Sequence, residues 1–209
     1  MARAATARRP GADTKREAIF DAALELFGRY GYRRTSIDDI ARAAGVAKGT
    51  VYLYVETKEA LFRTLAQSLL DGVLENARAA AGRGGDVAGR LLAILDAKFG
   101  FFHDLLRRSP HASELLDSTS RLCADVFAAG DAAYLALVTK AVSDAVRRRE
   151  LAPRRHGLGA GEVAHLLLAG AHGIAADPAR LLSSDEHRKR LDALVRVVVD
   201  GLRAREEER

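Results

Sequence analysis

The stretch that most constrains the fold of this chain runs from residue 32 to residue 62, where a single glycine separates two short helical patterns. Ser36 is placed to cap the first of them, since its hydroxyl can accept from the free N–H groups of an opening helical turn. Gly45 follows at the position where a helix commonly ends in a left-handed residue. A second short helix is predicted over residues 47–54. Helix, glycine turn and helix together form the geometry that places a helix in the major groove of DNA.

Cationic and hydroxyl side chains gather on this second helix, beside a glycine that allows a close backbone approach. Such groups suit phosphate oxygens and base edges, and the apolar Leu53 suits a thymine methyl group. Lys58 adds a cation just after the Thr57 cap, where the start of the next helix itself attracts anions. A small helical corner with half-buried tyrosines is the alternative that the motif alone leaves open. The candidate DNA-contacting residues are Thr35, Ser36, Lys48, Gly49, Thr50, Tyr52, Leu53, Tyr54 and Lys58.

From residue 14 to residue 62 the chain resembles the N-terminal domain of the tetracycline-repressor (TetR) family of bacterial transcription regulators. The resemblance rests on the pieces IFDAALELFGRYGYRRTSIDDIARAAGVAKGTVYLYVETKEALF, in the family's order and spacing, and covers about the first quarter of the chain. Three departures stand out. Ala47 replaces a frequent Ser and so lacks a capping hydroxyl worth about 1 kcal/mol. Val55 replaces the usual Phe under the recognition helix, and Leu53 replaces a frequent His.

The resemblance implies an all-α protein with three parts. Residues 1–12 would be a flexible basic arm, residues 13–60 a three-helix domain that carries the helix-turn-helix, and residues 61–209 a helical domain for ligand binding and dimerisation. Three arginines and no acidic residue occur in the arm. Such an arm either reaches DNA, as basic arms do elsewhere, or is a passive tail.

Apolar residues at helical spacing predict about nine helices in all, and no strand is signalled. A helix runs from about residue 57 to 81, another from 87 to 108, and one long helix from about 118 to 150. Two closing helices, over residues 160–176 and 185–205, look like the family's dimerisation pair, with packing inside one subunit as the alternative. The candidate dimer-interface residues are Val163, Leu167, Gly170, Ile174, Leu191, Leu194, Val198 and Leu202.

Aromatic and apolar side chains also recur at helical spacing in the middle of the second domain. Each alone is typical of a core. In the family, an effector binds among the central helices, so together they favour an apolar pocket with a few polar groups. The candidate ligand-binding residues are Phe99, Phe102, His103, Leu106, Leu122, Phe127, Tyr134 and Val138.

The composition sets further limits. A net charge of +5 permits a polyanionic partner without demanding one. No apolar run approaches the roughly 20 residues of a membrane span, and no secretory signal is recognised. The single Cys123 excludes an internal disulfide, and His165 and His172 are too far apart to share a metal ion comfortably. Without a nucleophile elbow or a phosphate loop, we expect a cytoplasmic protein that is not an enzyme and holds no metal or cofactor.

Two functions from different classes follow from these patterns. The first is a ligand-responsive homodimeric transcriptional regulator, expected to be a repressor, which binds a palindromic DNA operator and is released by a small, predominantly apolar effector. The second is a helical small-molecule binding protein, or an enzyme, that has kept the fold without operator binding. The cationic and hydroxyl groups of the second short helix favour the first function, because an abandoned DNA site has no reason to keep them.

Overall fold

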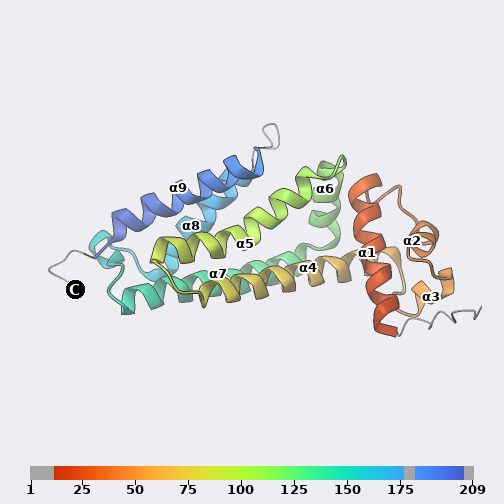
Figure 1. Ribbon diagram of the computed structural model, residues 1–209, viewed down its shortest axis with the longest axis horizontal. Coiled ribbons are helices and arrows are strands. Elements are labelled where there is room, and N and C mark those ends of the chain that lie inside the picture. The colour runs from red at the N-terminus through yellow and green to blue at the C-terminus, as the bar shows by residue number, and fades with distance from the viewer. Residues whose placement is uncertain (1–11, 177–181, 205–209) are drawn as a thin grey trace, which may run out of the picture. The chain divides into compact units, whose positions relative to one another are not determined.

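The computed structural model describes residues 12–176 and 182–204, and helices account for most of this part of the chain (Figure 1). The all-α prediction is confirmed. The predicted basic arm lies outside the described residues except for Ala12. The helices are α1 (Ala12–Tyr30), α2 (Ile37–Ala43), α3 (Lys48–Tyr52), α4 (Lys58–Ala81), α5 (Val87–Arg107), α6 (Ala112–Leu122), α7 (Ala124–Arg147), the 3-10 turn η1 (Pro153–His156), α8 (Ala160–Ala175) and α9 (Ser184–Leu202).

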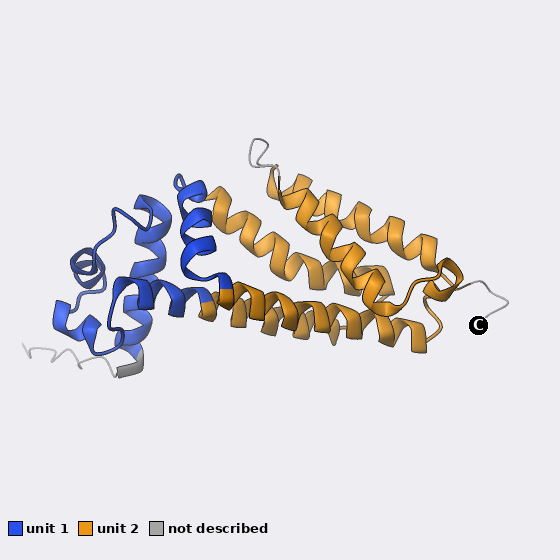
Figure 2. Ribbon diagram, turned by 180° about the vertical axis from the view of Figure 1, so that it is seen from behind, with its two compact units in different colours: residues 1–66, 109–124 blue, residues 67–108, 125–209 orange. Residues whose placement is uncertain are grey.

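The chain forms two compact units (Figure 2). The first unit comprises residues 1–66 and 109–124, and the second comprises residues 67–108 and 125–209. The first boundary between these units lies after residue 66, whereas the sequence predicts a domain boundary after residue 60. Helix α4 passes from one unit into the other, and α6 belongs to the first unit. The chain therefore crosses between the units at three points in its sequence.

The first unit is held together by apolar residues that the helical period of α1 brings to one side. Ile19, Ala23 and Phe27 recur every four residues and are at most 2% exposed, as expected for one face of a helix. Val51 of α3 is fully buried in the same unit. The ring of Phe27 also meets that of Phe62 edge-on, with 5.4 Å between ring centroids, an arrangement that aromatic pairs prefer. Large apolar side chains thus fix the short helices α2 and α3, which would not be stable alone.

The predicted single helix over residues 118–150 is wrong, because the structure divides this region into α6 and α7 at Cys123. No glycine or proline marks the break. Cys123 is fully buried in the first unit, and its N–H still bonds to the carbonyl of Thr119. The Arg63 guanidinium donates to the Leu122 carbonyl, one of the acceptors that a helix end leaves unsatisfied. The break is therefore stabilised by contacts between segments distant in sequence.

The core of the second unit forms mainly between α5 and α9, with α8 against both. Leu91, Ile94 and Leu95 of α5 are at most 1% exposed. On α9, Leu191 and Val195 are fully buried one helical turn apart. Burying such side chains contributes about 1.5–3 kcal/mol each, and this packing fixes the second unit.

Helix α7 is long and apolar enough to span a membrane by length and composition alone. Within the second unit, however, Tyr134, Val138 and Val142 form a stripe at four-residue spacing that is at most 2% exposed. The same helix carries Asp131 and Asp144, both in ion pairs. One side of α7 therefore packs in the core of the second unit, and a single helix of this length and composition is weak evidence of a membrane span.

Candidate nucleic-acid interface

Two local devices set the geometry of the helix-turn-helix. The Ser36 hydroxyl accepts from the Asp39 N–H at 3.2 Å, while the Asp39 carboxylate accepts from the Ser36 N–H at 3.1 Å. This reciprocal capping box satisfies two donors at the start of α2. The hydrogen bonds from Ser36 also lower the pKa of Asp39 below its usual value. After α2, Gly45 has a φ of 67°, so the predicted left-handed turn is present and directs the chain into α3.

Helix α3 exposes most of the side chains predicted to contact DNA. Tyr52 and Leu53 are 47% and 82% exposed, and no atom lies within 4 Å of the point where a Cβ on Gly49 would be. Thr50 and Tyr54 are half-buried. The helix starts at Lys48 without a side-chain cap, as the alanine at position 47 predicts. At Gly49 a ligand can therefore come close to the α3 backbone, beside the exposed side chains of Tyr52 and Leu53.

The ammonium group of Lys48 is held by a neighbouring carboxylate. Its Nζ lies 2.9 Å from Asp38 Oδ2, and both side chains are about half exposed. The hydrogen bond to Asp38 raises the pKa of Lys48, which keeps the side chain cationic. Because exposed ion pairs of this kind are weak, a phosphate oxygen can compete with Asp38 for the ammonium group.

Thr35 occupies a different environment from the one predicted. It is 3% exposed, and its hydroxyl hydrogen-bonds to the carbonyls of Gly31 and Leu26, at 2.8 and 3.2 Å. The predicted DNA contact of its side chain is therefore wrong. The hydroxyl instead ties the end of α1 to the segment that leads into α2.

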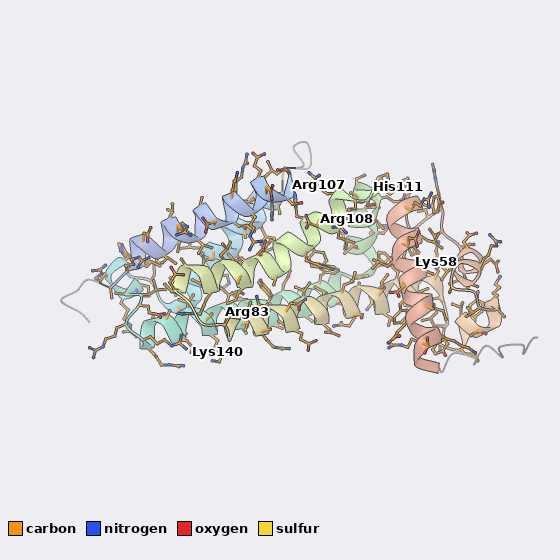
Figure 3. All side chains as sticks on the ribbon, in the orientation of Figure 1. Lys58, Arg83, Arg107, Arg108, His111 and Lys140 are labelled. Carbon is orange, nitrogen blue, oxygen red and sulfur yellow. The ribbon has the colours of Figure 1, made fainter. Side chains whose placement is uncertain are left out.

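Lys58, labelled in Figure 3, bonds to the backbone of its own unit. Its Nζ donates to the carbonyls of Tyr32 and Thr35, at 3.0 and 3.1 Å, and lies 4.4 Å from the centroid of the Tyr32 ring. Burial lowers the pKa of Lys58, and the nearby Glu114 carboxylate offsets part of this effect. Two of its three N–H donors thus have partners inside the unit, which gives Lys58 a structural role, and its phosphate contact stays a prediction.

Replacing Lys58 by Met should lower the free energy of unfolding by about 1–3 kcal/mol, because the Tyr32 and Thr35 carbonyls lose their charged donor. Methionine keeps much of the aliphatic packing. Lys48→Met is the matched control, and it should change stability by less than about 0.5 kcal/mol, since that side chain is on the surface. Denaturant unfolding followed by circular dichroism measures both, and equal stabilities would contradict the structural role.

A further anchor comes from α6. Glu114 Oε1 accepts from the Arg33 N–H at 2.7 Å, and Asp117 forms a 3.6 Å ion pair with the Arg33 guanidinium. Ser109, just before α6, donates to the Gly28 carbonyl at 2.7 Å. The segment between α1 and α2 is thus held by residues about 80 positions away in the sequence. No local sequence pattern indicates these residues.

The predicted ligand-binding residues are divided by the fold. Leu122 ends α6 in the first unit, while the other seven lie in the second. Phe99, Tyr134 and Val138 are at most 5% exposed and belong to the core. The Tyr134 hydroxyl donates to the Ile94 carbonyl, and burial raises the pKa of Tyr134. These three residues therefore support the packing of the second unit.

The remaining predicted ligand residues are half-buried. The rings of Phe102 and Phe127 lie 6.0 Å apart between centroids. His103 stacks on His187 at 4.2 Å, and its Nε2 lies 2.9 Å from the Leu182 carbonyl oxygen. Lys98, which no sequence pattern indicates, is 7% exposed, pairs with Asp131 at 2.5 Å and has its Nζ 4.8 Å from the centroid of the Tyr134 ring.

The predicted dimer residues fall into two groups. Val163, Leu167, Leu191 and Leu202 are at most 6% exposed, so they pack inside one chain, which is the alternative that the sequence left open. The other four, Gly170, Ile174, Leu194 and Val198, are half-buried. A Cβ on Gly170 would lie 2.7 Å from a methyl carbon of Leu194, so this glycine allows α8 and α9 to pack closely within one chain.

Two large apolar side chains remain on the outer surface of α8 and α9. Leu166 is 52% exposed and Val197 is 73% exposed. Leu166 lies one helical turn from Gly170, and Val197 lies three residues after Leu194, so these residues adjoin the half-buried group. Together, Leu166, Val197 and the half-buried residues form what we call the α8–α9 outer face.

Comparison with known proteins places the strongest similarity in the first unit. Residues 19–65 match the family model described as bacterial regulatory proteins, tetR family. The HTH-type transcriptional regulator YvdT of Bacillus subtilis is 43% identical over 61 residues, covering 29% of this chain and 31% of that protein. The chain aligns with about a third of the length of the curated relatives it matches.

Similarity in fold extends further than similarity in sequence. A transcriptional regulator from Cytophaga hutchinsonii has a TM-score of 0.71 at 20% identity, covering 92% of this chain and all of that one. The transcriptional regulator FadR from Bacillus subtilis, solved in complex with stearoyl-CoA, has a TM-score of 0.62 at 19% identity, covering 88% of this chain and 96% of that one. At these identities the likeness is one of fold.

Proposed function

We propose that this chain is a ligand-responsive homodimeric transcriptional regulator, because its residues 19–65 match the tetR-family model. The observation that carries the proposal is the surface of α3, where Lys48, Gly49, Tyr52 and Leu53 are all exposed. A capped α2 and a left-handed Gly45 hold this helix in a helix-turn-helix. Exposed cationic, hydroxyl and apolar groups on one short helix suit phosphates and base edges in a major groove.

The proposed partner is a palindromic double-stranded operator, bound by two copies of the chain. Half-sites read by such helices lie about 34 Å apart or a multiple of one helical turn, so both copies must bind together. The α8–α9 outer face is the proposed dimer interface. We propose repression as the mode of regulation and the cytoplasm as the location, with no enzymatic activity.

The proposed effector is a small, predominantly apolar molecule that binds the second unit near Phe102 and Phe127. Half-buried rings 6.0 Å apart are suited to an apolar ligand. The stearoyl-CoA complex of FadR shows a ligand on a protein of the same fold. Three crossings of the chain between the units offer covalent routes by which ligand binding can alter the first unit. A coupling of about 3 kcal/mol would weaken operator binding roughly 150-fold.

A gel-shift titration with the DNA upstream of the protein's own gene tests this function. Log affinity should fall linearly with log salt, and Lys48→Ala should reduce the slope by about one unit per subunit, because one phosphate contact is lost. Lys140→Ala is the matched control, since Lys140 also pairs with an aspartate at 2.9 Å but lies in the second unit. An unchanged slope would remove Lys48 from the phosphate contacts. If the protein shifts none of the DNA fragments, the alternative function is favoured, a helical small-molecule binding protein or an enzyme that has kept the fold without operator binding.

A further inference from the structure

The second unit contains a cavity of about 500 Å³ at the end of α4, the start of α5 and the later turns of α7. Its volume falls within the range of small-molecule sites, about 300–1,000 Å³. It includes none of the eight predicted ligand-binding residues. The cavity is therefore a separate feature from the aromatic group of Phe102 and Phe127.

The lining of this cavity has an apolar side. Val87, Leu91 and Ile94 of α5 line it and are at most 5% exposed. Leu137 and Ala141 of α7 also line it and are half-buried. Apolar surface of this kind gains about 25 cal/mol for each Å² removed from water. A bound molecule with a hydrocarbon or aromatic part would therefore gain affinity from this side.

The same lining carries four cations and one carboxylate. The cations are Arg78, Arg90, Lys140 and Arg148, and the carboxylate is Asp144. Lys140, labelled in Figure 3, bonds to Asp144 at 2.9 Å, and this bond is the largest cause of the lowered pKa of Asp144. The cavity therefore has an excess of positive charge beside its apolar side.

Two of the four cations are already in use inside the protein. Arg90 is 12% exposed at its side chain, pairs with Glu150 and donates to the Gly85 carbonyl. Within the described part of the chain, two of the cavity cations form ion pairs. Arg90 pairs with Glu150, and Lys140 pairs with Asp144. Arg78 and Arg148, both exposed, take part in neither. Their guanidinium groups are thus the ones that a ligand can engage.

We infer that this cavity binds a small amphipathic anion, with its apolar body against α5 and α7 and its acidic group at Arg78 and Arg148. Guanidinium groups bind carboxylates, sulfonates and phosphates through paired N–H donors. An inorganic anion would leave the apolar side unused, and a neutral apolar molecule would leave the charge excess unused. This site is independent of the proposed function, because it needs neither DNA binding nor a dimer.

Two fluorescent probes that differ by one sulfonate test the inference. 1-Anilinonaphthalene-8-sulfonate is the amphipathic anion, and N-phenyl-1-naphthylamine is its uncharged counterpart. In the Arg78→Gln/Arg148→Gln variant, affinity for the sulfonate should fall at least about tenfold, because two charge-assisted contacts are lost. Affinity for the uncharged probe should change less than about twofold, which also shows that the variant is folded. Arg188→Gln/Arg190→Gln on α9 is the control with the same net charge and should bind both probes like the parent.

A second variant tests the apolar side. Ala141→Trp places an indole in the cavity and should abolish the binding of both probes there, while circular dichroism reports whether the helices are retained. Three results would overturn the inference. They are unchanged sulfonate affinity in the arginine variant, an equal loss in the α9 control, and binding that responds to Phe102→Ala but not to the cavity variants.

Discussion

Introducing two carboxylates on the α8–α9 outer face, as in Leu166→Glu/Val197→Glu, is expected to give a monomer that binds its operator about 10²- to 10⁴-fold more weakly. Both side chains are more than half exposed in the single chain, so the substitutions disturb no intrachain core. At a two-fold interface each substitution is present in both copies, and a carboxylate buried there without a partner is costly. A monomer binds one half-site at a time. It loses the high effective concentration that a dimer has for the second half-site once the first is bound.

Light scattering measures the oligomeric state, and a gel shift on the same samples measures operator affinity. Phe101→Glu is the control, because Phe101 is an exposed apolar residue of the second unit that lies on α5. It should stay dimeric. A dimer in the double variant would place the interface on another surface, and a monomer that binds DNA with undiminished affinity would remove the need for dimerisation.

Helical periodicity predicts which side of α9 is apolar. The spacing of Leu191, Leu194 and Val198 correctly indicates an apolar helix face. It does not indicate which partner covers that face, because the pattern is the same for a neighbouring helix in the chain and for a second subunit. In the structure Leu191 is fully buried inside the unit. Val197 of α9, whose position breaks the apolar period of the buried face, is 73% exposed.

The helix-turn-helix is easier to predict from the sequence, because its helix caps and its turn depend on residues close together in the chain. Ser36 with Asp39, Gly45, and the uncapped start of α3 each depend on residues within a few positions of one another. The internal bonds of Lys58 were missed because its partners, the Tyr32 and Thr35 carbonyls, lie 26 and 23 residues earlier in the chain, where local patterns do not place them. The same limit explains Glu114, which reaches Arg33 across 81 residues. The burial of Thr35 was missed although its partners, the Gly31 and Leu26 carbonyls, are close in sequence.

An added methyl group at Gly49 should affect folding and DNA binding in opposite directions. Gly49→Ala is expected to stabilise the first unit by about 0.5–1 kcal/mol, because glycine is a poor residue within a helix. No atom lies within 4 Å of the added Cβ position, so the protein itself has room for the methyl group.

The methyl group would, however, stand on the α3 surface that is proposed to approach DNA. A misfitting methyl costs on the order of 1–3 kcal/mol in a close-packed contact, and a dimer meets it at both half-sites. Operator affinity should therefore fall at least about thirtyfold, while the unfolding midpoint rises. Gly28→Ala in α1 is the matched control, since its Cβ position is also free of neighbours, and it should stabilise the unit without changing affinity. Parent-like operator binding by Gly49→Ala would mean that DNA does not approach the α3 backbone at this residue.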